Sequence, residues 1–227
     1  TNLRERSTEL FAYDAIEWTP ALSTWLGLRH TRLSRDSVRT DGSRATRDQR
    51  SFTTPWLAGS WQLDPAHMLY ASWGQGVESE VAPGRSRYTN AGQPLPTLQS
   101  RQWELGVKHD DGRLRWNATL FNITRPLSGD VGSCDVEASC TRVIDGDARH
   151  RGLELGAGTR LGAWSLQGSA SVIHARRRGG AIAPDLNGQA PTNVPEWVLR
   201  ASLGYRFAAV PGLSAVATLS HEGRRNV

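Results

Sequence analysis

Apolar and polar residues alternate along most of the chain with a period of two, as in a β-strand that lies between two different environments. Residues 153–161 show the pattern well: every odd position is Leu, Ala or Thr, while Glu154, Arg160 and two glycines take the even positions. Residues 164–172 repeat the alternation. The turn Gly162-Ala163 between the two runs therefore predicts a β-hairpin.

The same pattern along the chain predicts ten strands. The turns Asp110-Asp111-Gly112 and Pro211-Gly212 separate two further pairs of alternating runs. To within ~2–4 residues, the strands are placed at about 7–17, 20–33, 53–63, 67–77, 99–109, 112–125, 143–160, 164–176, 194–207 and 212–223. No helical period interrupts them. The predicted fold is all-β, an antiparallel up-and-down meander of about ten long strands.

The predicted connections alternate between short and long. The short ones fall near 18–19, 64–66, 110–111, 161–163 and 208–211. The long ones cover 34–52, 78–98, 126–142 and 177–193. Strands of a soluble β-sandwich are ~5–6 residues long, and such a fold has no reason for this alternation. An outer-membrane barrel has short periplasmic turns, longer outside loops and strands of about 10 residues that cross the bilayer at a tilt. The sequence favours such a barrel over a soluble all-β protein with tryptophan in its core.

In such a barrel the apolar face of each strand contacts lipid and the polar face lines the lumen. The residues expected to face lipid are Leu153, Leu155, Leu166, Leu120, Trp116, Leu199 and Leu203. Those expected to face the lumen are Glu154, Arg160, Arg115, Arg200 and Arg206. Aromatic residues near strand ends fit an interfacial girdle: Trp18, Trp103, Trp164, Trp197, Tyr205 and Phe207.

Composition narrows the class of protein further. The 227 residues suit one large domain or two small ones, and the mean hydropathy of −0.48, with no apolar run near ~18 residues, excludes a transmembrane helix. The net charge is +5, but only Lys108 among the 27 basic residues is lysine. This charge is therefore only weak evidence for a nucleic-acid partner, and we expect no such partner. The only methionine is Met68, so we expect a mature product or a piece of a longer protein.

No catalytic arrangement can be read from the strands. The six histidines lack metal-ligand spacing, and no Ser-His-Asp or paired-carboxylate arrangement emerges. An outer-membrane protease or lipase is therefore disfavoured, and we expect no enzyme activity. Cys134 and Cys140 lie six residues apart in a polar stretch, where an oxidising compartment would join them in a disulfide. A metal-binding pair is the alternative, although neither cysteine has a nearby histidine or a second pair.

Several residue strings resemble the strands of TonB-dependent siderophore receptors. Residues 69–76, LYASWGQG, resemble the family string LYASYGQGF, and residues 118–125, ATLFNITR, resemble AALFNITR. Further matches are 101–108 (RQWELGVK), 151–155 (RGLEL), 194–197 (VPEW) and 26–30 (LGLRH). All occur in the family's order and at its spacing, across roughly residues 7–223. Each string is weakly specific, whereas the set together is strong.

The resemblance implies a barrel of about 22 strands with a plugged lumen. Residues 1–227 would then form a partial TonB-dependent receptor β-barrel domain, a middle-to-late arc without the plug domain, the TonB box, the early strands or the last strands. As an arc inside a larger sheet it should not close on itself, so its first and last strands should keep free edges.

The resemblance also implies a location and partners. The location would be the outer membrane of a Gram-negative bacterium, with outer-membrane lipid and lipopolysaccharide around the barrel. The transported ligand would be a ferric siderophore, with no bound cofactor, and the TonB–ExbB–ExbD complex would supply energy through the plug. The alternatives are a TonB-dependent receptor for haem, cobalamin or another chelate, or a passive porin-like barrel.

Two groups of residues are candidates for ligand binding. Arg85, Arg87 and Tyr88 lie in the long 78–98 connection, and Tyr and Arg are effective anchors for ligands. Arg176 and Arg177 lie where a strand meets a long outer loop and could form a cationic rim for an anionic chelate, since the guanidinium fork matches carboxylates. Binding of these arginines to lipopolysaccharide phosphates, or a plain solvated loop, is the alternative.

The predicted lumen face also carries charged residues that need partners. We expect them to pair with one another or with the plug: Glu104, Lys108, Arg113 and Arg115. No residue is assigned a catalytic role or a role as a metal ligand.

Overall fold

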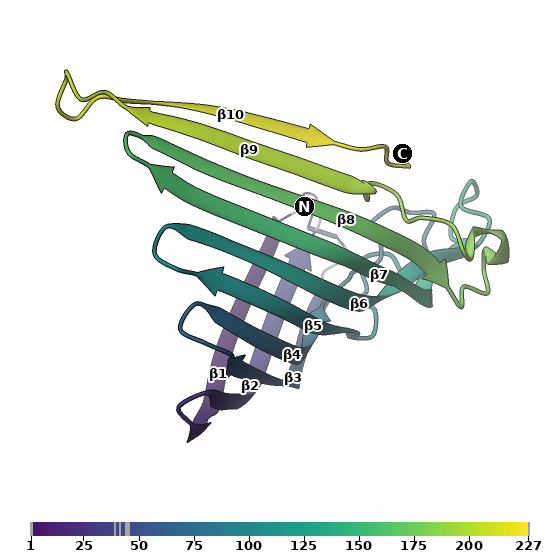
Figure 1. Ribbon diagram of the computed structural model, residues 1–227. Coiled ribbons are helices and arrows are strands. Elements are labelled where there is room, and N and C mark those ends of the chain that lie inside the picture. The colour runs from purple at the N-terminus through teal and green to yellow at the C-terminus, as the bar shows by residue number, and fades with distance from the viewer. Residues whose placement is uncertain (1, 39, 41, 44–45, 227) are drawn as a thin grey trace.

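The computed structural model describes residues 2–38, 40, 42–43 and 46–226, which form one curved ten-stranded sheet (Figure 1). The strands are β1 (Asn2–Thr19), β2 (Leu22–Val38), β3 (Thr46–Gln62), β4 (His67–Glu78), β5 (Leu98–Asp110), β6 (Leu114–Gly132), β7 (Cys140–Leu161), β8 (Trp164–Arg178), β9 (Trp197–Arg206) and β10 (Ser214–Glu222). Over these residues the only helical element is the 3-10 turn η1 (Pro184–Leu186). No described helix is long and apolar enough to span a membrane.

The strands follow one another in space in the order of the sequence, and each pairs antiparallel with the next. This confirms the predicted meander. Long connections lie at one end of the sheet and tight turns at the other, here called the long-connection end and the short-turn end (Figure 1). β1 and β10 are the two edges of the sheet order, and no ladder between them is present in the part of the chain that is described. The sheet is thus an open arc.

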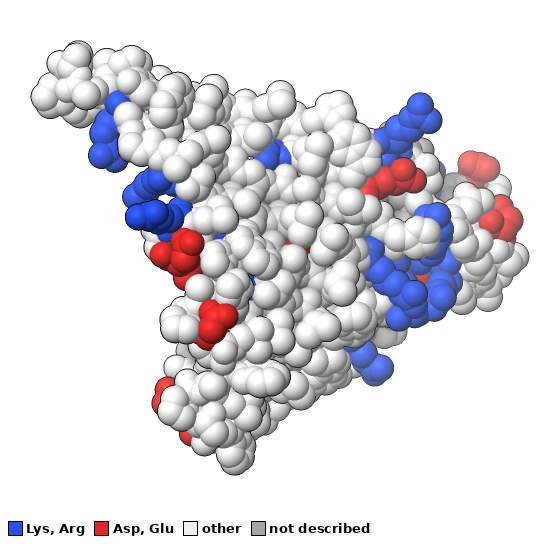
Figure 2. All heavy atoms as spheres, viewed as in Figure 1, with Lys and Arg blue, Asp and Glu red and all other residues white. Residues whose placement is uncertain are grey.

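The pairing register gathers the apolar residues on one face of the sheet. Leu120 lies opposite Leu105 and Leu153, and Leu166 lies opposite Leu203. We call this the outer face and the opposite one the inner face. The sheet curls away from the viewer at β1–β3 in Figure 1, and Figure 2 shows that the middle of the face nearest the viewer carries few charges. This matches the predicted division between lipid-facing and lumen-facing residues.

Aromatic rings lie close against glycines on the inner face. A Cβ added to Gly106 would lie 2.4 Å from the ring of Tyr70, and one added to Gly152 would lie 2.4 Å from the ring of Phe121. The Tyr70 hydroxyl is also 2.7 Å from the hydroxyl of Thr119 on the same face. These rings cover backbone that glycine would otherwise leave exposed, and they project little from the inner face of the sheet.

Two predicted long connections are wrong, because most of their residues continue the strands. Within the predicted 34–52 connection, β2 continues to Val38 and β3 begins at Thr46, with residues 39, 41 and 44–45 outside the described part, and the 126–142 connection shrinks to 133–139. The ladder persists there through pairs such as Asp36 with Arg47 and Asp130 with Arg142. Backbone hydrogen bonds hold these extensions together, while polar residues occupy both faces, so the alternating pattern used for prediction disappears.

Candidate functional site

The long-connection end is built up by the 79–97 connection, which folds against the end of the β6–β7 hairpin. Thr89 N–H donates to the Cys140 carbonyl at 2.7 Å, and Cys140 N–H donates to the Arg87 carbonyl at 3.0 Å. The Asn90 side chain bridges the Arg142 backbone, accepting from its N–H at 3.1 Å and donating to its carbonyl at 2.7 Å. We call the 79–97 connection together with residues 126–146 the shelf.

A partly buried ion cluster lies inside the shelf. Arg142 reaches Asp130 Oδ1 and Glu80 Oε1, each at 3.1 Å, and so joins the connection to the hairpin. Although burial by itself lowers the pKa of Arg142, hydrogen bonds to Asp130 and Glu80 outweigh it and raise that pKa. Tyr88 donates its hydroxyl to Asp130 Oδ2 at 2.9 Å. Burial, and then the bond to Asp130, raises the pKa of Tyr88.

The three candidates in the 79–97 connection occupy different positions. Tyr88 is only 6% exposed and its hydroxyl is engaged with Asp130, so it supports the shelf from within. The Arg87 guanidinium lies 5.7 Å from the centre of the Tyr88 ring and donates to the Cys134 carbonyl at 3.3 Å. Arg85 is exposed. Of the three, Arg85 is therefore the most accessible to a ligand.

Cys134 and Cys140 are joined in a disulfide at the tip of the β6–β7 hairpin, with their Cα atoms 4.7 Å apart. Both lie at the long-connection end, as expected. Asp130 lies within reach of the two sulfurs. Since a bonded sulfur is not a thiolate, it is no ligand for a metal ion. The disulfide instead fixes the hairpin tip onto which Arg87 donates.

Arg176 and Arg177 come just before the last residue of β8, on opposite faces of the strand. Arg176 lies opposite Arg149 in the register, while Arg177 lies opposite Ala148. Arg177 also exchanges backbone hydrogen bonds with Gly188 and Gln189, at 2.8 and 2.9 Å. Across the described residues, no hydrogen bond or ion pair joins this pair to Arg85, Arg87 or Tyr88. The structure thus divides the five candidates into two separate groups.

The inner face forms a polar hollow of about 570 Å³ between β5 and β9. Its lining includes Lys108, Arg115, Asn117, Gln167 and Arg200. The expected ion pairs among the charged inner residues do not form within the described chain. Lys108 instead lies 4.8 Å from the centre of the Tyr70 ring, and Glu104 accepts a hydrogen bond from Gln102 at 2.5 Å. The inner wall is therefore polar, and these charged side chains are not neutralised by ion pairs among the described residues.

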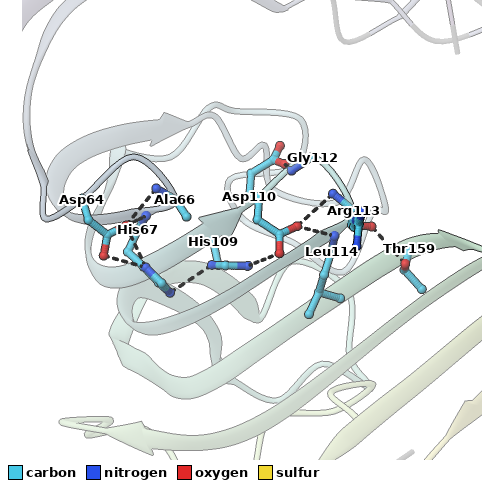
Figure 3. A network of polar contacts seen from close by, with 10 residues as sticks. Asp64, Ala66, His67, His109, Asp110, Gly112, Arg113, Leu114 and Thr159 are labelled. Atoms are coloured by element: carbon cyan, nitrogen blue, oxygen red, sulfur yellow. Dashed lines mark hydrogen bonds and ion pairs between the residues drawn. The ribbon is translucent and has the colours of Figure 1, made fainter.

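A polar network that no local sequence pattern predicts lies at the short-turn end (Figure 3). Asp64 contacts His67 Nδ1 at 2.9 Å, His67 Nε2 lies 2.9 Å from His109 Nδ1, and His109 Nε2 lies 3.6 Å from Asp111. His109 also stacks on Trp116, with ring centres 5.6 Å apart. The histidines are far apart in sequence and meet only through the β4–β5 register, so local spacing could not reveal them.

The two aspartates of this network are held as anions by the turns. Asp64 accepts the N–H groups of Ala66 and His67 at 2.8 and 2.9 Å, and these bonds, first that of Ala66, lower the pKa of Asp64. The N–H groups of Leu114 and Arg113 lower the pKa of Asp111 in the same way. The network thus ties the β3–β4 turn to the β5–β6 turn.

The structure is an open arc of long antiparallel strands, apolar on the outer face and polar on the inner face. Tight turns lie at one end and the shelf at the other. These features define a segment of an outer-membrane barrel. A family model described as TonB dependent receptor-like, beta-barrel, matches residues 1–226, and the chain belongs to this family. The long-connection end is accordingly the extracellular end. Members of this family are receptors and transporters of the Gram-negative outer membrane rather than enzymes, as the sequence predicts.

One curated relative is similar in sequence, and solved structures share the fold. The ferrichrome receptor FcuA of Yersinia enterocolitica is 32% identical over 135 residues, which cover 59% of this chain and 17% of the relative. The ferric preacinetobactin receptor BauA of Acinetobacter baumannii superposes with a TM-score of 0.68 at 24% identity, over 94% of this chain and 31% of that one. The alcaligin receptor FauA of Bordetella pertussis gives 0.72 at 19% identity, over 98% and 38%. The chain thus spans between about a sixth and two fifths of the length of these proteins.

Proposed function

We propose that the receptor containing this chain imports a ferric siderophore across the outer membrane. The observation that carries the proposal is the match of the whole arc to the TonB-dependent barrel family, together with the likeness of more than half the chain to a ferrichrome receptor. Uptake through such a barrel needs a plug domain encoded elsewhere in the same protein. The outer membrane has no ATP, so the TonB–ExbB–ExbD complex of the inner membrane would supply energy through that plug.

Within this chain the shelf supplies the cargo-facing surface. Arg85 is exposed there, while Arg87 is held against Tyr88 and the hairpin carbonyl of Cys134. Arg177 lies on the inner side of β8 at the same end of the barrel. Guanidinium groups pair bidentately with carboxylates, so these side chains suit an anionic chelate. Tyr88 acts by holding the shelf rigid, because a preorganised surface loses less entropy on binding.

The test is iron uptake by the full-length receptor, expressed in a siderophore-deficient host that lacks its own receptors. We expect transport of ⁵⁵Fe loaded on at least one hydroxamate or catecholate siderophore, ferrichrome being the first to try. We also expect transport to stop when tonB is deleted. Uptake that persists without TonB would support a passive porin-like barrel and overturn the proposal. TonB-dependent uptake restricted to haem or cobalamin would overturn the siderophore assignment.

The shelf is tested in the same assay with Arg85→Gln. Loss of one charge-assisted contact, about 1.5–3 kcal/mol, should weaken siderophore binding roughly tenfold or more, seen as a higher half-saturating concentration. The control is Arg47→Gln, which removes an exposed arginine that is paired with Asp36 elsewhere at the extracellular end. The control should bind as the wild type does. Equal binding by both variants would exclude Arg85 from the cargo surface.

A further inference from the structure

Two histidines face one another on the outer face at the short-turn end, which is the periplasmic end of the wall. His67 begins β4 and His109 lies near the end of β5, and the register places them directly opposite each other. They follow the apolar pair Leu69 and Val107 on the same face, so they lie just beyond the apolar band. Figure 3 shows the contact between them, in which His67 Nε2 is 2.9 Å from His109 Nδ1. The pair lies outside the barrel, away from the path of a cargo through the lumen.

An aspartate holds the far nitrogen of each ring. Asp64 lies 2.9 Å from His67 Nδ1, and Asp111 lies 3.6 Å from His109 Nε2. Backbone N–H groups of the turns lower the pKa of both aspartates and so keep them anionic. An ionised carboxylate only accepts hydrogen bonds, so each ring places its proton on the nitrogen that faces its aspartate.

The two nitrogens that face each other are consequently left as acceptors. A neutral imidazole has one N–H group, and in both rings that group points to an aspartate. His67 Nε2 and His109 Nδ1 therefore turn two lone pairs toward one another, 2.9 Å apart. Two acceptors this close need a cation between them. A carboxylate behind each histidine is also the arrangement that orients histidine ligands in metal sites.

The spacing of the two nitrogens fits neighbouring ligands of one metal ion. Imidazole nitrogens bind such ions at about 2.0–2.1 Å, so two of them are about 2.9 Å apart at a right angle and about 3.4 Å apart at the tetrahedral angle. The observed 2.9 Å matches the right angle. The ring centres are only 4.5 Å apart, so the rings converge at an angle rather than meeting end to end. Right angles between nitrogen ligands are typical of Cu²⁺ and Ni²⁺ in tetragonal sites.

The surroundings of the pair suit a bound cation. The His67 side chain is 38% exposed, so water can supply the remaining ligands. The His109 side chain is 12% exposed and stacks on Trp116, with ring centres 5.6 Å apart, which fixes its orientation. Asp64 and Asp111 add negative charge close to the pair, which a divalent cation would balance.

We propose that His67 and His109 bind a divalent transition-metal ion at the periplasmic end of the barrel wall, with Asp64 and Asp111 orienting the two rings. The affinity should be highest for Cu²⁺, which leads the order of first-row divalent ions and accepts a right angle between its ligands. A tetrahedral Zn²⁺ site would require the two nitrogens to move apart by about 0.5 Å. The bound ion would link the β3–β4 turn to the β5–β6 turn. The ligands are 42 residues apart in the sequence, so spacing along the chain gives no sign of the site.

The test is Cu²⁺ binding by the full-length receptor, purified in detergent without a polyhistidine tag and stripped of metal with a chelator. Isothermal titration calorimetry gives the affinity and the number of ions bound, and the EPR spectrum of bound Cu²⁺ gives the number of nitrogen ligands. The variants are His67→Gln, His109→Gln and Asp64→Asn. The control is His221→Gln, which changes a histidine that stacks on Trp197 at the opposite end of the wall. Heat-modifiable migration on gels confirms that each variant is folded.

We expect each of the two histidine variants to bind one Cu²⁺ ion fewer than wild type and to lose the EPR signature of two nitrogen ligands. Asp64→Asn should keep the ion but bind it more weakly, because loss of such a carboxylate costs about 10–100-fold in metal affinity. His221→Gln should bind as wild type does. Folded His67→Gln and His109→Gln variants that keep the wild-type number of ions, with affinity within about twofold, would overturn the proposal. An equal loss in His221→Gln would also overturn it, because binding would then belong to single surface histidines.

Discussion

At the scale of single residues, Arg142 carries more of the extracellular structure than any exposed arginine. Its guanidinium joins Glu80 of the 79–97 connection to Asp130 of the hairpin, and Asp130 in turn accepts the Tyr88 hydroxyl. Exposed pairs such as Arg47 with Asp36 contribute little, because water screens them. The Arg142 cluster is less exposed, so its hydrogen bonds hold the shelf together.

We predict that Arg142→Gln loosens the shelf while the barrel stays assembled. The change leaves two partly buried carboxylates without their cation, which costs about 1–3 kcal/mol of local stability. Hydrogen–deuterium exchange of the full-length receptor should show faster exchange in residues 79–97 and unchanged exchange in β8 and β9. Tyr88→Phe removes a single hydrogen bond and should give a smaller effect. Unchanged exchange at the shelf in Arg142→Gln would refute this role.

At the scale of elements, the alternating pattern predicts strands only where the two faces meet different environments. Residues 153–161 alternate because leucine contacts lipid on one face and charged side chains contact water on the other. The extensions 34–38 and 126–132 are predicted as loops because they carry polar residues without this alternation, although the backbone ladder continues through them.

Contacts within the candidate site were harder to foresee. Tyr88 contacts Asp130, which is 42 residues away in the sequence, and His67 contacts His109 at the same sequence separation. Such meetings depend on register and loop packing, which no local pattern encodes. The sequence could place Arg85 and Arg87 in a long connection and Arg176 and Arg177 at a strand end. It could not show that Tyr88 is buried or that Arg176 belongs to the outer face.

The two aspartate turns give a prediction about pH. Backbone N–H groups lower the pKa of Asp64 and Asp111, so the folded state favours their anions. A lowered pKa stabilises the fold at pH values above the ordinary 3.8, and this contribution is lost as the pH falls through the folded-state pKa. The double variant Asp64→Asn, Asp111→Asn should therefore melt below wild type at neutral pH.

The measurement is the difference in Tm between wild type and this double variant across a pH series. Below about pH 5 the difference should shrink as the wild-type aspartates take up protons. Asparagine keeps an acceptor oxygen, so the comparison isolates the charge. A difference that grows toward low pH would have the wrong sign for this explanation.

At the scale of the whole molecule, the described strands form an open arc with β1 and β10 at its edges. The edges of β1 and β10 carry backbone groups that a lipid cannot satisfy, each costing several kcal/mol. Neighbouring strands of a larger barrel would satisfy them. The arc nonetheless has the features expected of a receptor wall. These are an apolar outer face, an aromatic girdle, a polar inner face and the shelf at the extracellular end.

The aromatic girdle shows how the arc is seated in the membrane. At the short-turn end Trp164 lies 4.5 Å from Tyr205, and Tyr205 lies 4.9 Å from Phe207, measured between ring centres. Toward the extracellular end, Trp73 lies opposite Trp103 in the register. Aromatic rings favour the two interfaces of a bilayer, so these groups bracket the apolar band.

The most direct test of this account is the assembly of full-length receptor variants, read as heat-modifiable folded barrel on gels. Leu155→Arg and Leu203→Arg place a charge on the lipid face, which costs about 2–4 kcal/mol at the bilayer midplane and less toward the interface, so assembly should be lost most completely in Leu155→Arg. Arg115→Ser and Arg206→Ser change the inner wall and should assemble as wild type does. Normal assembly of both leucine variants together with failure of Arg115→Ser would reverse the faces and contradict the account.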